Sequence, residues 1–199
     1  TNMGRLHELA DQIERNHRIT LGVVSGGNSA NIEWALTTAQ IGRTNELRLG
    51  ETILLGTEPL QRRAILGLHT DAFTLVGEVI ECGTKPARPW GSRGQSAYGQ
   101  MAERTGTGTI RQAIVALGRQ DVALDGLKPP IGISILGMSS DHLILDVGDL
   151  GVAVGDEMRF GLGYGALLSA MTSPFVAKVE SGFADVASAA PEHGDCRNY

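Results

Sequence analysis

The segment VSGGNSANI, residues 24–32, joins the end of an apolar run to two glycines, Asn28 and Ser29. The β-branched run ITLGVV, residues 19–24, predicts a strand, and the residues after Ser29 predict a helix over 32–39. A second short strand is predicted over 46–49, and the amphipathic segment 3–17 predicts a helix ahead of the first strand. The order helix, strand, glycine turn, helix, strand is typical of an α/β fold.

The glycine turn before the predicted helix is a place where an anion can bind. Glycines let the backbone approach a ligand closely, the start of a helix has unpaired N–H groups, and Ser29 adds a hydroxyl. Arg48 and Gly50 follow the next predicted strand, and in an α/β barrel both loops would face the same end. The alternatives are an ordinary helix cap at Ser29 and a solvated Arg48 on the surface.

Beyond residue 70, short apolar runs separated by Gly, Pro and Asp predict a mostly β second half. The runs cover residues 72–83, 108–118, 130–137, 141–149, 156–162 and 173–181. We therefore predict three parts: an α/β part over 1–70, a β-rich domain over 71–184 and a flexible tail over 185–199.

Composition narrows the class of protein. Hydrophobic residues make up 42% and charged residues 20% of the 199 residues, and no apolar run is long enough to span a bilayer. The net charge of -5 and the scattered basic residues argue against nucleic-acid binding. Cys82 and Cys196 lack metal-ligand spacing, so we expect no metal site and a reducing, cytoplasmic location.

Six stretches, taken in order, resemble the C-terminal portion of ornithine racemase-like proteins, which are similar to the alanine racemase family of pyridoxal-phosphate enzymes. They are VSGGNS, LRLGETILLG, KPARPWG, AIVALGRQDV, LGMSSDHLILDV and VGDEMRF. The resemblance implies an α/β plus β fold class: the last βα units of a TIM-type (β/α)8 barrel, followed by a mostly β C-terminal domain. It also implies a pyridoxal-phosphate-dependent amino-acid racemase that acts on an amino-acid substrate as a dimer or higher oligomer.

The resemblance assigns cofactor contacts to the residues around the glycine turn. Asn28 and Ser29 match the pair that holds the cofactor phosphate, and Gly50 with Glu51 match the backbone donors to it. Arg48 matches the arginine that faces the pyridine nitrogen. A guanidinium there keeps this nitrogen unprotonated, because a second adjacent cation would be repelled. The ring then withdraws electrons less strongly, which favours return of a proton to the α-carbon.

The candidate catalytic residues lie in two later loops. Arg119 stands where alanine racemases carry a tyrosine that acts as one base, so the role of that tyrosine is unassigned in this chain. Asp121 either orients Arg119, acts as a catalytic group itself or is an exposed turn residue. Asp141 and His142 align with the substrate-carboxylate loop, although a histidine entering a strand is often structural. If ornithine is the substrate, Glu51, Asp121 and Asp141 are the candidates to receive its distal ammonium.

Three further residues are weaker candidates. Tyr164 matches a phosphate-contacting tyrosine of the family, and packing in the core is the alternative. Lys85 and Arg88 are candidates to contact a substrate carboxylate across a subunit interface, with a solvated loop as the alternative.

The family requires a lysine that binds the cofactor covalently, and this chain has only Lys85, Lys128 and Lys178. Lys85 and Lys128 precede prolines, and Lys178 lies in the last predicted strand. About six of the eight barrel strands are also missing, and two βα units cannot close a barrel. We therefore expect a complementary N-terminal barrel fragment or subunit that carries the lysine, without which the chain should be unstable or aggregate.

The absence of the cofactor-binding lysine and the presence of Arg119 in place of a tyrosine leave two alternative functions. One is a non-catalytic subunit that binds the cofactor or serves as a scaffold. The other is an enzyme of the same fold and cofactor that catalyses a different reaction, such as a lyase or an epimerase.

Overall fold

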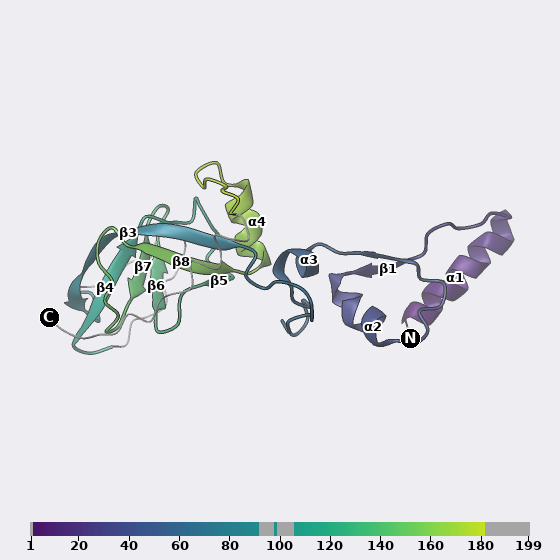
Figure 1. Ribbon diagram of the computed structural model, residues 1–199, viewed down its shortest axis with the longest axis horizontal. Helices are drawn as coiled ribbons and strands as arrows, with labels where there is room; N and C mark the ends of the chain where they lie inside the picture. The colour runs from purple at the N-terminus through teal and green to yellow at the C-terminus, as the bar shows by residue number, and fades with distance from the viewer. Residues whose placement is uncertain (1, 92–97, 99–105, 182–199) are drawn as a thin grey trace.

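The computed structural model describes residues 2–91, 98 and 106–181. Two regions follow each other along its long axis (Figure 1). The N-terminal region contains α1 (Asn2–His17), β1 (Ser25–Asn28), the 3-10 helix η1 (Ser29–Asn31), α2 (Ile32–Thr37), β2 (Glu46–Arg48) and α3 (Glu51–Leu55). The C-terminal region contains the remaining strands and one helix. The predicted boundary at residue 70 stays a prediction.

Strands β1 and β2 form a parallel two-stranded sheet, as expected of consecutive βα units. The predicted strand over 19–24 is wrong in position, because β1 begins only at Ser25. The side chain of Asn45 accepts a hydrogen bond from Val24 N (2.9 Å) and donates one to Gly22 O (2.9 Å). These backbone groups are therefore bonded to a side chain, and the pairing with β2 starts after them.

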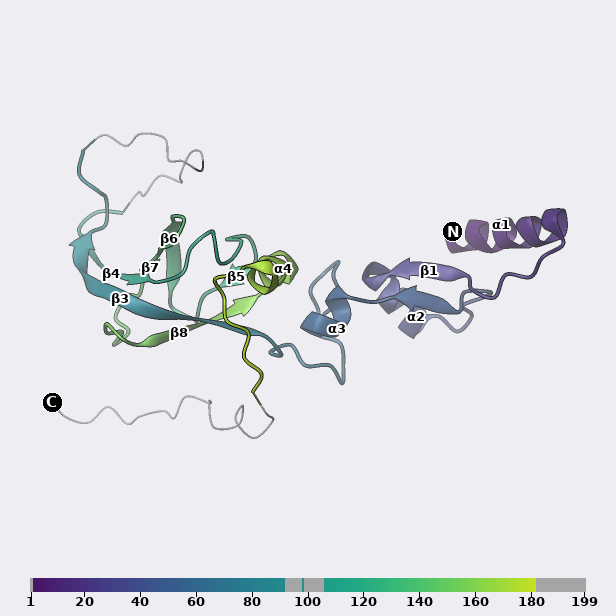
Figure 2. The ribbon, with the colours of Figure 1, turned by 90° about the horizontal axis from the view of Figure 1, so that it is seen from above.

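The C-terminal region is a six-stranded antiparallel sheet with the order β5-β8-β3-β4-β7-β6. Its strands are β3 (Thr74–Pro86), β4 (Thr109–Val115), β5 (Leu127–Lys128), β6 (Ser134–Met138), β7 (Leu143–Asp146) and β8 (Glu157–Leu162). The long strand β3 pairs with β8 over its first half and with β4 over its second half. The sheet consequently curls around one face, which α4 (Tyr164–Thr172) adjoins (Figure 2).

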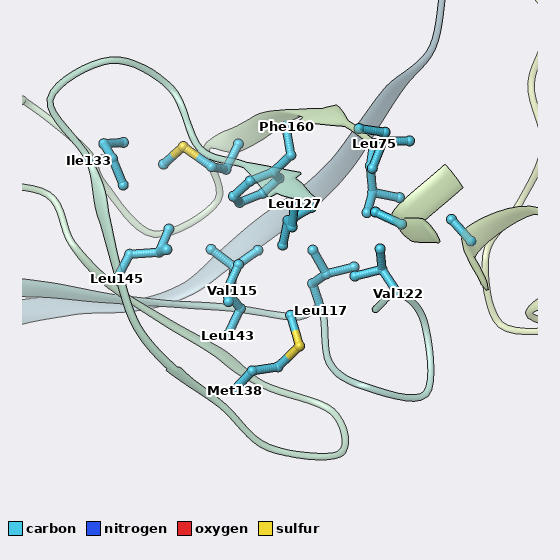
Figure 3. Packing of buried hydrophobic residues seen from close by; sticks show 14 of the residues in the cluster. Leu75, Val115, Leu117, Val122, Leu127, Ile133, Met138, Leu143, Leu145 and Phe160 are labelled. Carbon is cyan, nitrogen blue, oxygen red and sulfur yellow. The ribbon is translucent and has the colours of Figure 1, made fainter. Parts of the chain in front are cut away.

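The core of the molecule lies inside the curled sheet (Figure 3). Strand β8 shows why: Met158, Phe160 and Leu162 are buried, and the residues between them are exposed, which is the period-two pattern of a half-buried strand. Phe160 is fully buried among residues from β3, β4 and β7. Leu55 of α3 belongs to the same cluster, so the N-terminal region is anchored to the β-rich region through this helix.

The segment that follows α3 is held by one carboxylate. Glu58 accepts hydrogen bonds from the backbone N–H groups of Leu60, Gln61 and Arg63. Burial raises the pKa of the Glu58 carboxyl, but the hydrogen bonds from Arg63, Leu60 and Gln61 outweigh this effect and hold the pKa below its usual value. The ionised carboxylate therefore fixes the turn between the two regions.

Two features of the C-terminal region differ from the prediction. Residues 173–181 form no strand; the Nζ of Lys178 instead donates hydrogen bonds to the carbonyls of Ser173 and Val176, so this segment is folded locally. Helix α4 was not predicted, because its residues are apolar on nearly every side and give little helical periodicity. In the described part of the chain, no helix has the length and apolar character needed to cross a membrane.

Candidate functional site

The parallel pairing of β1 with β2 places the ends of both strands side by side. Asn28 at the end of β1 is in register with Arg48 at the end of β2. The side chain of Asn28 accepts a hydrogen bond from Ala30 N (3.1 Å), which caps η1. Arg48 is exposed, and its guanidinium has no hydrogen-bond or ion-pair partner among residues 2–91, 98 and 106–181.

Ser29 connects the two loops that follow these strands. Ser29 is only 6% exposed, and its Oγ lies 3.3 Å from Gly50 N and 3.4 Å from Thr52 N, both of which donate to it. We call Ser29, Gly50 and Thr52 the Ser29 cluster. The cluster joins a hydroxyl and two backbone amides from separate loops, next to the strand end that carries Arg48. Together these groups are a suitable set of donors for an anion.

Thr52 was not singled out from the sequence, where Gly50 and Glu51 were named instead. Its amide donates to Ser29, and its own Oγ1 is buried without a hydrogen-bond partner within the described structure. Glu51 directs its carboxylate to Arg62 in an ion pair. The sequence does not indicate that Thr52 is an amide donor, because only the geometry of the turn decides which backbone N–H points toward Ser29.

The turn 118–121 and the loop 139–142 pack against each other, and we call them the paired loops. Arg119 N donates to Ser139 O (3.0 Å), and Gln120 N donates to Ser140 O (2.9 Å). Gly118 permits this contact, because a Cβ there would lie 2.2 Å from Asp141 N and from the Ser140 carbonyl oxygen. The two predicted catalytic segments, about twenty residues apart in sequence, are thus side by side.

Asp121 and Asp141 have different environments within the paired loops. Asp121 is 9% exposed and accepts a hydrogen bond from Gly118 N (2.7 Å), so its carboxylate closes its own turn. The Asp141 side chain is 53% exposed, and its Oδ1 accepts from the hydroxyls of Ser140 (3.1 Å) and Ser139 (3.2 Å). The Nδ1 of His142 lies 3.1 Å from the same oxygen.

The carboxyl of Asp141 is held in its ionised form. The hydroxyl of Ser140 chiefly, with the ring of His142 and the hydroxyl of Ser139, lowers the pKa of Asp141 below its usual value, against the opposing effect of burial. The guanidinium of Arg119 lies over the Tyr98 ring, 4.6 Å from its centre. The paired loops therefore present one fixed anion and one stacked cation.

The remaining predicted residues lie elsewhere. Tyr164 is the first residue of α4 and is 41% exposed, so it is not a core residue. Lys85 is in β3, where it forms an ion pair with Glu81, and Arg88 is exposed. Among the described residues, no hydrogen bond or ion pair links the Ser29 cluster to the paired loops. Most of the predicted site residues therefore belong to two separate groups, one around the Ser29 cluster and one in the paired loops.

Two relatives with curated names match most of the chain. It is 42% identical over 177 residues to a lysine racemase of Thermotoga maritima, covering 87% of this chain and 50% of the relative. It is 39% identical over 182 residues to an ornithine racemase of Acetoanaerobium sticklandii, covering 89% of this chain and 51% of the relative. The chain spans about half the length of these relatives, and no family model matches it.

Solved structures give the same fold. An alanine racemase from Streptomyces coelicolor superposes with a TM-score of 0.53 at 18% identity, covering 85% of this chain and 46% of that structure. A D-threonine aldolase from Filomicrobium marinum also gives a TM-score of 0.53, at 16% identity, with 84% and 40% covered. The predicted fold class, closing βα units of a barrel followed by a mostly β domain, is confirmed. The chain is therefore homologous to the C-terminal half of the lysine and ornithine racemases, and it has the alanine racemase fold.

Proposed function

We propose that this chain is the C-terminal part of a pyridoxal-phosphate-dependent amino-acid racemase. The observation that carries the proposal is the Ser29 cluster, which gathers a hydroxyl and two amides next to the strand end that carries Arg48. The names of the two relatives support racemisation, and ornithine and lysine are the proposed substrates.

The residues present fit the phosphate of the cofactor. A phosphate accepts hydrogen bonds, and the Ser29 hydroxyl and the amides of Gly50 and Thr52 are donors within reach of one another. The hydroxyls of Ser25 and Thr52 are buried without a described partner. Buried polar groups of this kind are normally satisfied, so a bound anion or a neighbouring chain would complete their hydrogen bonding.

We assign roles to the chain's own residues as follows. Asn28, Ser29 and the amides at residues 50–52 hold the phosphate, and Arg48 faces the pyridine nitrogen. When bound, the cofactor withdraws electrons from the α-carbon of the amino acid. Arg119 and His142 are the candidates to move a proton at that carbon, and Asp121 closes the turn that positions Arg119. Asp141 belongs to the loop that is proposed to contact the substrate. Tyr164 is a further candidate to contact the cofactor phosphate.

The lysine that binds the cofactor is proposed to come from a complementary N-terminal half. All three lysines of this chain lie in its β-rich region, at residues 85, 128 and 178. The sheet of β1 and β2 has two strands, so both of its edges are open to further strands. A barrel completed by another segment or subunit, in a cytoplasmic dimer or higher oligomer, would cover these edges.

The proposal is tested on the assembly purified from its native source. Mass spectrometry should detect a polypeptide segment that carries the missing barrel strands. Chiral chromatography should show conversion of L-ornithine or L-lysine to a racemic mixture, and borohydride should abolish this activity together with the visible absorbance of the cofactor. An assembly that contains the complete barrel, and neither binds the cofactor nor racemises any amino acid, would contradict the proposal.

A different reaction on the same fold is the second candidate, because a D-threonine aldolase superposes as well as an alanine racemase does. Product analysis separates the two. A lyase cleaves a carbon–carbon bond and yields a smaller amino acid and an aldehyde, whereas a racemase returns the same atoms. A non-catalytic subunit would yield neither product, even in the complete assembly.

Replacing Ser29 by alanine should weaken cofactor binding. One hydroxyl to a charged phosphate contributes about 1–3 kcal/mol, so the dissociation constant should rise about tenfold or more. The measurement is equilibrium dialysis of the assembly against the cofactor. Thr38→Ala is a control, because this threonine lies beyond the end of α2. An unchanged dissociation constant for Ser29→Ala would remove Ser29 from the phosphate site.

Replacing Arg48 by lysine or alanine separates charge from geometry. Lysine keeps a cation but lacks the planar fork of donors, and alanine removes both. We expect cofactor retention to fall for alanine, and racemisation to give way partly to transamination, because a protonated pyridine nitrogen withdraws electrons more strongly. Keto-acid formation is measured against racemisation in the same sample. An unchanged ratio of the two products in both variants would contradict the place assigned to Arg48.

A further inference from the structure

The carboxylate of Asp141 is fixed at one oxygen and free at the other. Its Oδ1 receives the hydroxyls of Ser139 and Ser140 and lies beside Nδ1 of His142. Among the described residues, no other residue forms a hydrogen bond or ion pair with Oδ2. Three contacts on one oxygen hold the group in a single orientation, so the second oxygen is a preorganised acceptor in a half-exposed position.

We propose that Asp141 receives the side-chain ammonium of a diamino-acid substrate and thereby determines which class of amino acid the enzyme accepts. The proposal rests on the proposed racemase function and deepens it. An ammonium is a compact cation with three donors, and one free carboxylate oxygen is enough to bind it. A side chain without a terminal cation would gain nothing from this oxygen.

The other two acidic candidates are already engaged. Glu51 forms an ion pair with Arg62, and its side chain is 19% exposed. Asp121 is 9% exposed and its Oδ2 accepts the Gly118 amide, so removing it would leave a buried donor unpaired. The Asp141 side chain is 53% exposed, and no other described residue binds its Oδ2. Of the three carboxylates, Asp141 is the most exposed, and the contacts with Ser139, Ser140 and His142 all fall on one of its oxygens.

The paired loops give this acceptor a rigid base. Arg119 and Gln120 donate their amides to the carbonyls of Ser139 and Ser140, so the two residues before Asp141 are fixed to the turn 118–121. Arg119 belongs to the same base, with its guanidinium stacked on Tyr98. A cation and a fixed carboxylate on one rigid surface suit a ligand that has its own carboxylate and a separate ammonium.

The test compares two substrates of equal chain length in the complete assembly. L-Ornithine and L-norvaline differ only in the terminal ammonium. We expect Asp141→Asn to lower kcat/KM for ornithine by about 10- to 100-fold, the range for one charge-assisted hydrogen bond, chiefly through KM. The value for norvaline should change by less than about twofold, because norvaline has no group for this oxygen.

Asp149→Asn is the matched control, since it makes the same charge change at an exposed turn and should leave both substrates unaffected. An equal loss for both substrates, or no loss for ornithine, would overturn the proposal. Calorimetric titration of ornithine and norvaline gives a second readout that needs no turnover. If the assembly racemises nothing but binds ornithine preferentially through Asp141, the racemase function fails and the assignment of Asp141 stands; if binding shows no such preference, the assignment fails as well.

Discussion

Phe160→Ala is expected to lower the free energy of unfolding by about 3–5 kcal/mol, the range for removing a large aromatic side chain from a packed core. Phe160 is fully buried inside the curled sheet and belongs to the cluster drawn in Figure 3. The loss combines the transfer free energy of the ring with the cavity that remains, because the surrounding strands are tied by ladder hydrogen bonds and cannot close over it. Urea unfolding of the assembly, followed by circular dichroism, measures the change.

Val76→Ala is the control for this prediction. Val76 lies on β3, the neighbour of β8, but its side chain is on the outer face and 41% exposed. Its replacement should cost well under 1.5 kcal/mol, about what removal of methyl groups costs at buried sites. Similar losses for the two variants would mean that the inside of the sheet is not the core of the molecule.

The second large effect is expected from Gly118→Ala. A Cβ at this position would lie 2.2 Å from two backbone atoms of the opposite loop, the Ser140 carbonyl oxygen and Asp141 N. Backbone cannot move aside as a flexible side chain can, so the paired loops must separate and their two amide hydrogen bonds must break. We expect a loss of about 3 kcal/mol, the upper end for overpacking, together with a loss of racemisation.

Gly83→Ala is the matched control, because open space surrounds a Cβ at that position and the residue also lies in the β-rich region. It should leave activity and stability nearly unchanged. Hydrogen exchange followed by mass spectrometry adds a local readout, since separation of the paired loops should speed exchange at Arg119 and Gln120. Slow exchange there in Gly118→Ala would show that the loops tolerate the added methyl group.

Much of this architecture follows from short-range patterns in the sequence. Short apolar runs separated by Gly, Pro and Asp predicted most strands of the β-rich region, and the helix predicted over 32–39 corresponds to α2. The strand at 19–24 was misplaced because Asn45, more than twenty residues later, bonds to the backbone there. Residues 173–181 have a strand-like composition, but the hydrogen bonds of Lys178 fold them locally. Both errors come from side-chain contacts that no local pattern contains.

The candidate site was predictable to a different extent. Ser29 and Gly50 were named from the sequence, and the structure brings them together. The second amide that donates to Ser29 is that of Thr52 and not that of Glu51, because the turn after β2 decides which N–H faces Ser29. The pairing of the loops around Arg119 and Asp141 could not be anticipated, since it depends on the order of strands in the sheet. The catalytic roles of these residues stay predictions.

Strand β3 also limits where insertions and deletions can be tolerated in the chain. Its irregularity between Val79 and Glu81 lies close to where its partner changes from β8 to β4. One added codon beyond this irregularity would turn every following side chain of the strand to the opposite face, because residues alternate between the two sides. Insertions and deletions during evolution should therefore be confined to the connections at either end of β3, and its 13 residues should be inherited as a unit.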